Sequence, residues 1–194
     1  MAKFLKGKIV FVGDTSVGKT SIINSYNNDK GVVKPTVAAS SIPCNVDYEG
    51  EVVTLSIWDT AGQEDFHCLV PMYARSSQVA VIVFDLTNEQ TFDHIENWHK
   101  YLESSGNIPN IFLVGNKLDL QNDIIPDIND KMDQIAKKYN MKTFQTSAQL
   151  GQNIDVLFYA IAEAVQTTEQ EGPLPQVSIT REDNPKGKNS SCNC

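Results

Sequence analysis

The sequence predicts an α/β fold with three layers, in which a six-stranded, mostly parallel sheet carries helices on both faces. Short β-branched runs alternate along the chain with segments of helical periodicity, a pattern typical of parallel strands joined by crossover helices. The runs at 78–86 and 111–114 are almost wholly apolar, as expected of strands buried on both faces. A glycine-bearing loop joins the first run to a helix, and we expect the ligand of such a sheet at the carboxyl ends of its strands.

Strands and helices can be assigned in order along the chain. Six strands are predicted, at 8–12, 42–48, 52–58, 78–86, 111–114 and 143–146. Glu49-Gly50 suits a hairpin turn between the second and third, so we expect one antiparallel edge strand and five parallel strands. The first helix is expected at 18–27. Apolar stripes with a period of 3.6 residues predict three more helices, within 92–102, 128–139 and 154–165.

Composition predicts one globular domain and a tail. The chain has 194 residues, 41% of them hydrophobic, which suits a single domain with a full core. Periodicity stops after Thr168 and two prolines follow, so we expect a domain at 1–168 and a disordered tail at 169–194. We expect no signal peptide and no membrane-spanning run of about 20 apolar residues. The four cysteines fit neither a zinc site nor a disulfide framework, which favours a reducing cytosol.

Net charge restricts the class of ligand. A formal net charge of −8 argues against a sequence-independent nucleic-acid binder, which needs a basic face for phosphates. A small phosphorylated ligand is still allowed, because one cluster of backbone N–H groups can bind it. We expect a monomer that binds no nucleic acid.

Residues 13–20 form a complete phosphate-binding loop, G-x-x-x-x-G-K-[ST]. Its glycines let successive backbone N–H groups point at phosphate oxygens, and the next helix adds its positive end. Lys19 should bridge the β- and γ-phosphates, and the Thr20 hydroxyl should ligate Mg²⁺. The nucleotide contacts expected here are Gly13, Thr15, Ser16, Val17, Gly18, Lys19, Thr20 and Ser21. The side chains of Asp14 and Ser16 could affect the hydrolysis rate, but solvation of the loop is the role expected of both. The loop alone does not separate ATP from GTP.

Three further segments follow predicted strands. Asp59 ends the third strand, where an acid can hold Mg²⁺ through its water, and the nearby Gly62 N–H can reach a γ-phosphate. In Asn116-Lys117-Leu118-Asp119, the last carboxylate can accept two hydrogen bonds from guanine, and adenine lacks that donor pair. Thr146-Ser147-Ala148 can aim a backbone N–H at the guanine carbonyl, so Ser147 and Ala148 complete the expected base site.

These segments, in this order, resemble the Ras superfamily of small GTPases over about residues 6–165. The loop, the WDTAGQE of residues 58–64 and the NKLD of 116–119 carry the resemblance. It implies a P-loop GTPase fold that binds GTP or GDP with Mg²⁺ and hydrolyses GTP. It also implies that Thr36 ligates Mg²⁺ when the γ-phosphate is present, that Gly62 senses that phosphate, and that Gln63 orients the attacking water. An arginine would come in trans from a GTPase-activating protein.

Within the superfamily, the chain looks most like a Rab. WDTAGQE, Pro71-Met72-Tyr73, the FDLTN of residues 84–88 and a C-x-C terminus point that way. Such a protein is a switch in vesicular membrane traffic that works with exchange factors, a GDP-dissociation inhibitor or escort protein, and effectors. Cys192 and Cys194 look like a double prenylation site on the cytoplasmic face of intracellular membranes, with cycling through the cytosol. Phe66-His67 and Pro71-Met72-Tyr73 are similar to endosomal Rabs.

The first switch departs from the family pattern. Ala38 and Ser41 stand where Rabs usually carry a glycine and an aromatic residue, and the stretch 20–36 is slightly short. It lacks the aromatic that relatives lay against guanine, because Tyr26 should still be on the helix. We therefore predict faster nucleotide dissociation than in typical relatives. The departure motivates an alternative, a weakly hydrolysing nucleotide-binding scaffold or adaptor. The NKLD segment argues against the other alternative, a P-loop kinase or ATPase.

Overall fold

The computed structural model describes residues 5–29, 36, 39–62 and 64–171 of the chain. Six strands form one sheet in the order β2-β3-β1-β4-β5-β6, in which only the edge strand β2 runs antiparallel to its neighbour. The predicted six-stranded, mostly parallel sheet is confirmed. The strands are β1 (Leu5–Val12), β2 (Ala39–Tyr48), β3 (Glu51–Thr60), β4 (Val79–Asp85), β5 (Asn110–Asn116) and β6 (Lys142–Gln145).

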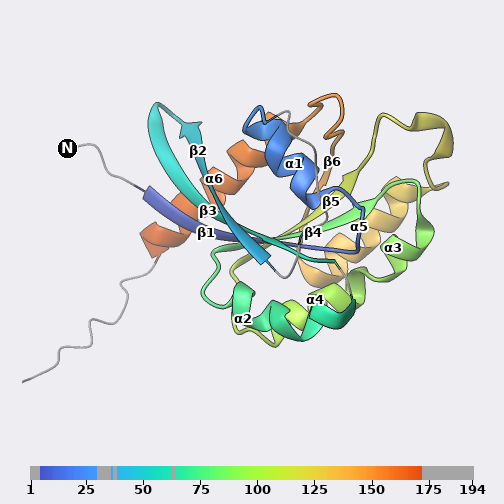
Figure 1. Cartoon of the computed structure of the whole chain (residues 1–194), viewed down its shortest axis with the longest axis horizontal. Coiled ribbons are helices and arrows are strands. Elements are labelled where there is room, and N and C mark those ends of the chain that lie inside the picture. The colour runs from blue at the N-terminus through green and yellow to red at the C-terminus, as the bar shows by residue number, and fades with distance from the viewer. Residues whose placement is uncertain (1–4, 30–35, 37–38, 63, 172–194) are drawn as a thin grey trace, which may run out of the picture.

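Helices connect the strands and cover both faces of the sheet (Figure 1). The α-helices are α1 (Lys19–Tyr26), α2 (Val70–Ala74), α3 (Glu89–Asp93), α4 (Ile95–Glu103), α5 (Ile128–Tyr139) and α6 (Ile154–Glu171). Two 3₁₀ helices, η1 (Glu64–Leu69) and η2 (Gln121–Asp123), complete the set among the described residues. None of the described helices is long and apolar enough to cross a membrane.

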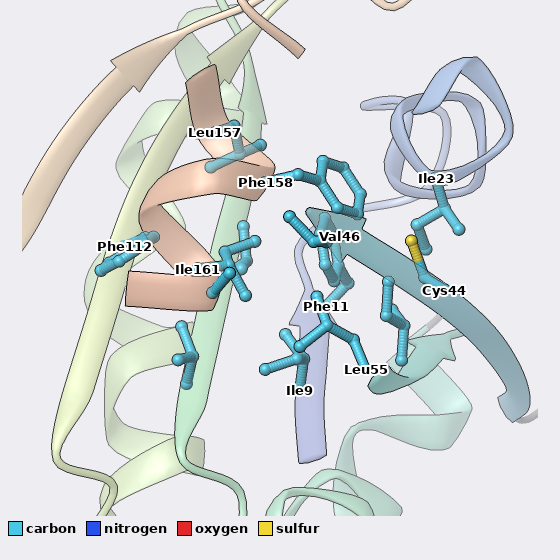
Figure 2. Close-up of a cluster of buried hydrophobic side chains, with 14 of the residues drawn as sticks. Ile9, Phe11, Ile23, Cys44, Val46, Leu55, Phe112, Leu157, Phe158 and Ile161 are labelled. Atoms are coloured by element: carbon cyan, nitrogen blue, oxygen red, sulfur yellow. The ribbon is translucent and has the colours of Figure 1, made fainter. Parts of the chain in front are cut away.

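The sheet divides the core into two clusters, because successive side chains of a strand point to opposite faces. Ile9 and Phe11 of β1 lie in the cluster under α1 and α6, where Phe158 and Ile161 of α6 approach the sheet (Figure 2). Val10 of the same strand lies in the second cluster, under α2, α4 and α5. Strands β1, β4 and β5 contribute residues to both clusters and are therefore packed on both faces.

Several element boundaries differ from the prediction. The stripe at 92–102 belongs to two short helices, α3 and α4, which meet at His94. The last helix runs to Glu171, three residues into the segment expected to be the tail. Apolar periodicity does end near Thr168, but no helix breaker comes before Gly172, and the Thr168 hydroxyl is bonded to the Ala164 carbonyl. Residues 172–194 lie outside the described residues.

Candidate functional site

The predicted site segments meet at one edge of the sheet. The phosphate loop follows β1, residues 59–62 end or follow β3, 116–119 follow β5, and 146–148 follow β6. The carboxyl ends of parallel strands lie side by side, so segments more than 100 residues apart in the chain become neighbours. The prediction that these segments lie at the carboxyl ends of the strands is confirmed.

Tight packing fixes the backbone of the phosphate loop. Gly13 and Gly18 have φ of 139° and 102°, which L side chains rarely adopt. A Cβ on Gly13 would lie 2.1 Å from the Val83 carbonyl oxygen, and one on Gly18 would lie 2.2 Å from the Asn116 amide nitrogen. Both glycines are therefore required by local geometry, and the loop is held against β4 on one side and the end of β5 on the other.

Lys19 lies across this loop with its ammonium almost fully buried. Only 6% of the residue is exposed, and Nζ donates to the carbonyl oxygens of Gly13 at 2.7 Å and Asp14 at 2.8 Å. Burial lowers the pKa of Lys19 to about 8, although the negative charges of Asp59 and Asp14 act in the opposite direction. Nζ has three N–H donors, so one is left for a ligand, and an anion placed there would stabilise the ammonium.

Three oxygen-bearing side chains converge beside Lys19. The hydroxyls of Thr20 and Thr36 donate to Asp59 Oδ2 at 2.6 and 2.9 Å, and the two hydroxyls lie 3.1 Å apart. The second carboxylate oxygen, Oδ1, is buried and has no hydrogen-bond partner among the described residues. Hydroxyl and carboxylate oxygens are the donors that Mg²⁺ accepts, so this group fits that ion.

Gly62 lies flat against the phosphate loop. A Cβ at this position would come within 2.3 to 2.5 Å of the Asp14 carbonyl group and the Thr15 nitrogen. The segment after β3 can therefore reach the loop only because residue 62 has no side chain. Gln63, the expected water-orienting residue, lies outside the described residues.

Asn116 connects the phosphate loop to the segment after β6. Its amide nitrogen donates to the Val17 carbonyl at 2.9 Å. Its oxygen accepts from the Thr146 hydroxyl at 3.2 Å and the Ala148 N–H at 3.1 Å. The Ala148 N–H, expected to face a guanine carbonyl, is thus bonded to Asn116, and a base carbonyl would have to share or replace that bond.

The remaining NKLD side chains are also positioned by partners. Asp119 is half-buried and accepts from the Ser147 hydroxyl at 2.5 Å. Lys117 has a φ of 70° and its ammonium lies 2.6 Å from Asp85 Oδ2. Burial would raise the pKa of Asp85, but the Lys117 ammonium and the amide and hydroxyl of Thr87 bring it below its usual value. The pairing of Asp85 with Lys117 was not predicted.

The first-switch departures are visible in part. Tyr26 is on α1, as predicted, and stacks on Phe158 with ring centroids 3.9 Å apart. Its ring therefore belongs to the core. Ser41 lies opposite Trp58 in the β2–β3 ladder, and Trp58 stacks on Tyr73 at 5.6 Å. Trp58 and Tyr73 thus pack together next to a position that lacks an aromatic side chain, and Ala38 lies outside the described residues.

Asp14 is not solvated as expected. Its carboxylate is bonded at 2.7 Å by His94 Nδ1 and also at 2.7 Å by Trp98 Nε1. These partners lie 80 and 84 residues away in the chain, so no local pattern could have indicated them. A cavity of about 630 Å³ opens next to this contact, with Thr15 and Gly62 on its loop side and α3 and α4 opposite.

Other polar residues have packing roles. The His67 ring lies edge-on to Trp98, with centroids 4.4 Å apart. His99 packs on Tyr139 at 4.2 Å, and burial lowers its pKa. Cys44 is buried, as expected of a packing residue, and burial raises the pKa of its thiol to about 12. Cys68 is exposed. Cys192 and Cys194 lie outside the described residues.

Comparison with known proteins finds relatives over most of the chain. A family model described as the Ras family matches residues 8–167. The chain is 39% identical over 171 residues to GTP-binding protein YPT53 of Saccharomyces cerevisiae, covering 84% of this chain and 78% of that protein. It is 39% identical over 174 residues to Ras-related protein Rab-22A of Homo sapiens, covering 86% and 87%. It is 34% identical over 197 residues to Ras-related protein Rab7 of Glycine max, covering 96% of each.

Proposed function

The chain belongs to the Ras family of small GTPases as a Rab-like member, and from this premise we propose which residues bind and hydrolyse its nucleotide and where it acts. It is a GTP hydrolase and a molecular switch in membrane traffic, using GTP or GDP and Mg²⁺. Regulators and effectors act on it as on Rabs in general. A weakly hydrolysing scaffold is not favoured.

The observation that carries the residue assignment is the convergence of Lys19, Thr20, Thr36 and Asp59 at the end of β1 and β3. The loop N–H groups and the free donor of Lys19 would bind the β- and γ-phosphates. Thr20 and Thr36 would give their hydroxyl oxygens to Mg²⁺, and Asp59 would hold its water. When bound, Mg²⁺ neutralises charge on the phosphate oxygens.

Hydrolysis needs a positioned water and a stabilised leaving group. We assign the water to Gln63, which directly follows Gly62, the residue in contact with the phosphate loop. Lys19 would stabilise, from its buried position, the negative charge that develops on the β- and γ-phosphates as GDP leaves. A GTPase-activating protein would add an arginine in trans.

Guanine selection is assigned to the NKLD segment. The Asp119 carboxylate is half-buried and held by Ser147, which leaves acceptor positions for the guanine N1 and N2 groups. Asn116 would act indirectly, since the hydrogen bonds that the structure describes for its side chain are with Val17, Thr146 and Ala148. This arrangement supports selection of GTP over ATP.

The cellular site is an endosomal membrane in this proposal. Residues 66–67 and 71–73 are similar to endosomal Rabs. Met72 is 61% exposed and precedes Tyr73, which stacks on Trp58, so an effector can contact it there. Cys192 and Cys194 would carry two prenyl chains, which together give the stable anchoring that one chain does not. Exchange factor, GDP-dissociation inhibitor and escort protein complete the expected partners.

Fluorescent mant-GDP binding tests the nucleotide assignment. In the presence of Mg²⁺, GTP should displace the probe and ATP should not. Multiple-turnover phosphate release from GTP, with Gln63→Leu as the inactive control, tests hydrolysis. Displacement by ATP would contradict the role given to Asp119, and equal release by both proteins would contradict the role of Gln63.

A further inference from the structure

The carboxylate of Asp14 fastens the phosphate loop to α4. Its two oxygens accept from two different side chains, Trp98 Nε1 and His94 Nδ1, each at 2.7 Å. Trp98 is almost fully buried, whereas His94 lies at the junction of α3 and α4 and is partly exposed. An acidic side chain in a loop that binds phosphates would repel them if it pointed inward. Here the carboxylate faces α4 and is bonded by two donors, so its charge is held away from the phosphate side.

The main chain of the same residue supports the reacting side of the site. The Asp14 carbonyl accepts from Lys19 Nζ at 2.8 Å. Gly62 contacts the Asp14 carbonyl group and the Thr15 nitrogen. A change in the position of Asp14 would therefore move the ammonium, a loop N–H and the segment that precedes Gln63 together.

The loop is fastened at its two halves by different elements. The leading half, residues 13–15, is tied to α4 through Asp14. The trailing half, residues 16–18, is tied to the base-side segment through the Asn116–Val17 bond. Gly62 lies against Asp14 and Thr15 of the leading half. In the proposed nucleotide assignment the leading half therefore faces the γ-phosphate, and the trailing half, which is bonded to Asn116, lies nearer the base.

A link to the second switch, the segment 64–74 that contains η1 and α2, runs through the same tryptophan. The His67 ring of η1 packs edge-on against Trp98, and α2 follows η1 directly. The indole thus contacts a switch residue with its ring and the phosphate loop with its N–H. We propose that Asp14, held by Trp98 and His94, is a positioning residue for GTP hydrolysis. It sets the leading half of the loop for the γ-phosphate and has little effect on the bound diphosphate; this inference rests on the nucleotide assignment above.

Single-turnover hydrolysis and the affinities for GTP and GDP test the inference. Asp14→Ala removes both bonds and should slow hydrolysis about tenfold, because small misplacements of reacting groups have effects of that size or more. It should weaken GTP binding more than GDP binding. Asp14→Asn keeps an acceptor for Trp98 and should restore the rate to within about threefold of wild type, a rescue based on hydrogen-bond geometry.

Trp98→Phe tests the same contact by changing its partner on α4, because it removes the N–H donor to Asp14 and keeps an aromatic ring against His67. It should also slow hydrolysis more than it weakens GDP binding, even if Asp14→Ala does not fold because the Trp98 N–H is left buried without an acceptor. Glu96→Gln is the matched control: it changes an acid to its amide on the same helix, and Glu96 pairs with Lys138 at 2.8 Å instead of with the loop. Its rate should equal that of wild type.

Two results would overturn the inference. One is a hydrolysis rate within twofold of wild type in both Asp14→Ala and Trp98→Phe. The other is an equal loss of GTP and GDP affinity, which would make Asp14 an ordinary stabilising contact. If the wild-type protein itself does not hydrolyse GTP, the assigned chemistry fails, but the ratio of GTP to GDP affinity in Asp14→Ala still decides the positioning role.

Discussion

Gly62→Ala should separate GDP binding from GTP hydrolysis. The φ of Gly62 is not in the left-handed region, so an alanine meets no backbone strain. Its Cβ would instead lie 2.3 Å from the Asp14 carbonyl carbon and 2.4 Å from the Thr15 nitrogen. Both contacts are backbone atoms of a loop that is fastened on two sides, so neither can give way easily.

Relief of this overlap requires the segment after β3 to move away by about 1 Å, and misplacements of that size cost on the order of a hundredfold in rate. We therefore expect Gly62→Ala to lower single-turnover hydrolysis about a hundredfold. GDP has no γ-phosphate for this segment to contact, so its dissociation rate should change by less than about threefold.

Stopped-flow phosphate release and mant-GDP dissociation measure the two effects. Gly50→Ala is the control for glycine replacement. It lies at the β2–β3 turn with a φ of 80° and nothing within 4 Å of a new Cβ, so it should lower the thermal stability and leave hydrolysis unchanged. Wild-type hydrolysis by Gly62→Ala would refute the close contact between the second switch and the phosphate loop.

Four other outcomes are expected. Asn116→Ala, which removes three hydrogen bonds from a residue that is 2% exposed, should lower the free energy of unfolding by about 3 kcal/mol in urea and weaken GDP and GTP alike; unequal weakening would argue against its clamp role. The pKa of Lys19 is about 8 in the folded, nucleotide-free protein and higher in the unfolded chain. At pH values between these two pKa values, the unfolded state therefore binds more protons than the folded state. The contribution of Lys19 to the melting temperature without nucleotide should therefore increase as the pH rises above 8, and this increase should be absent in Lys19→Met. Since Tyr26 is held against Phe158, mant-GDP should dissociate about ten- to a hundredfold faster than from relatives with an aromatic over the base, and a slow rate would contradict the prediction. Replacing Cys192 and Cys194 together by serine should move a fluorescent fusion from membranes to the cytosol, and retained membrane signal would contradict double prenylation.

The sequence predicts those parts of the fold and site that depend on a pattern of neighbouring residues. The apolar strands, the glycine loop and the NKLD segment each have a pattern within a few residues, and their order places them at one sheet edge. The second-switch region at 64–74 has no strong periodicity, because η1 and α2 are short, and it was not assigned as helical. The division at His94 was also missed, since the apolar stripe continues across it.

Long-range side-chain contacts explain the remaining errors at the site. The partners of Asp14 come from α4 and the partner of Lys117 comes from the end of β4. Asn116 belongs to a recognisable motif, but its hydrogen bonds to Val17, Thr146 and Ala148 depend on how the loops pack in three dimensions. A pattern of residue types therefore predicts which residues take part in such a network, but it does not predict which of them are hydrogen-bonded to one another.

The edge position of β2 has a consequence for association between molecules. An edge strand presents unpaired backbone N–H and C=O groups, to which another chain can add a strand and begin an aggregate. Pro43 lies within β2, opposite Ser56, and has no N–H to offer. A proline fits this ladder only where its nitrogen faces away from β3, so it interrupts the row of donors on the outer edge. When copies of this protein are crowded on a membrane, they should therefore contact one another through side chains, because addition of a strand to β2 is disfavoured.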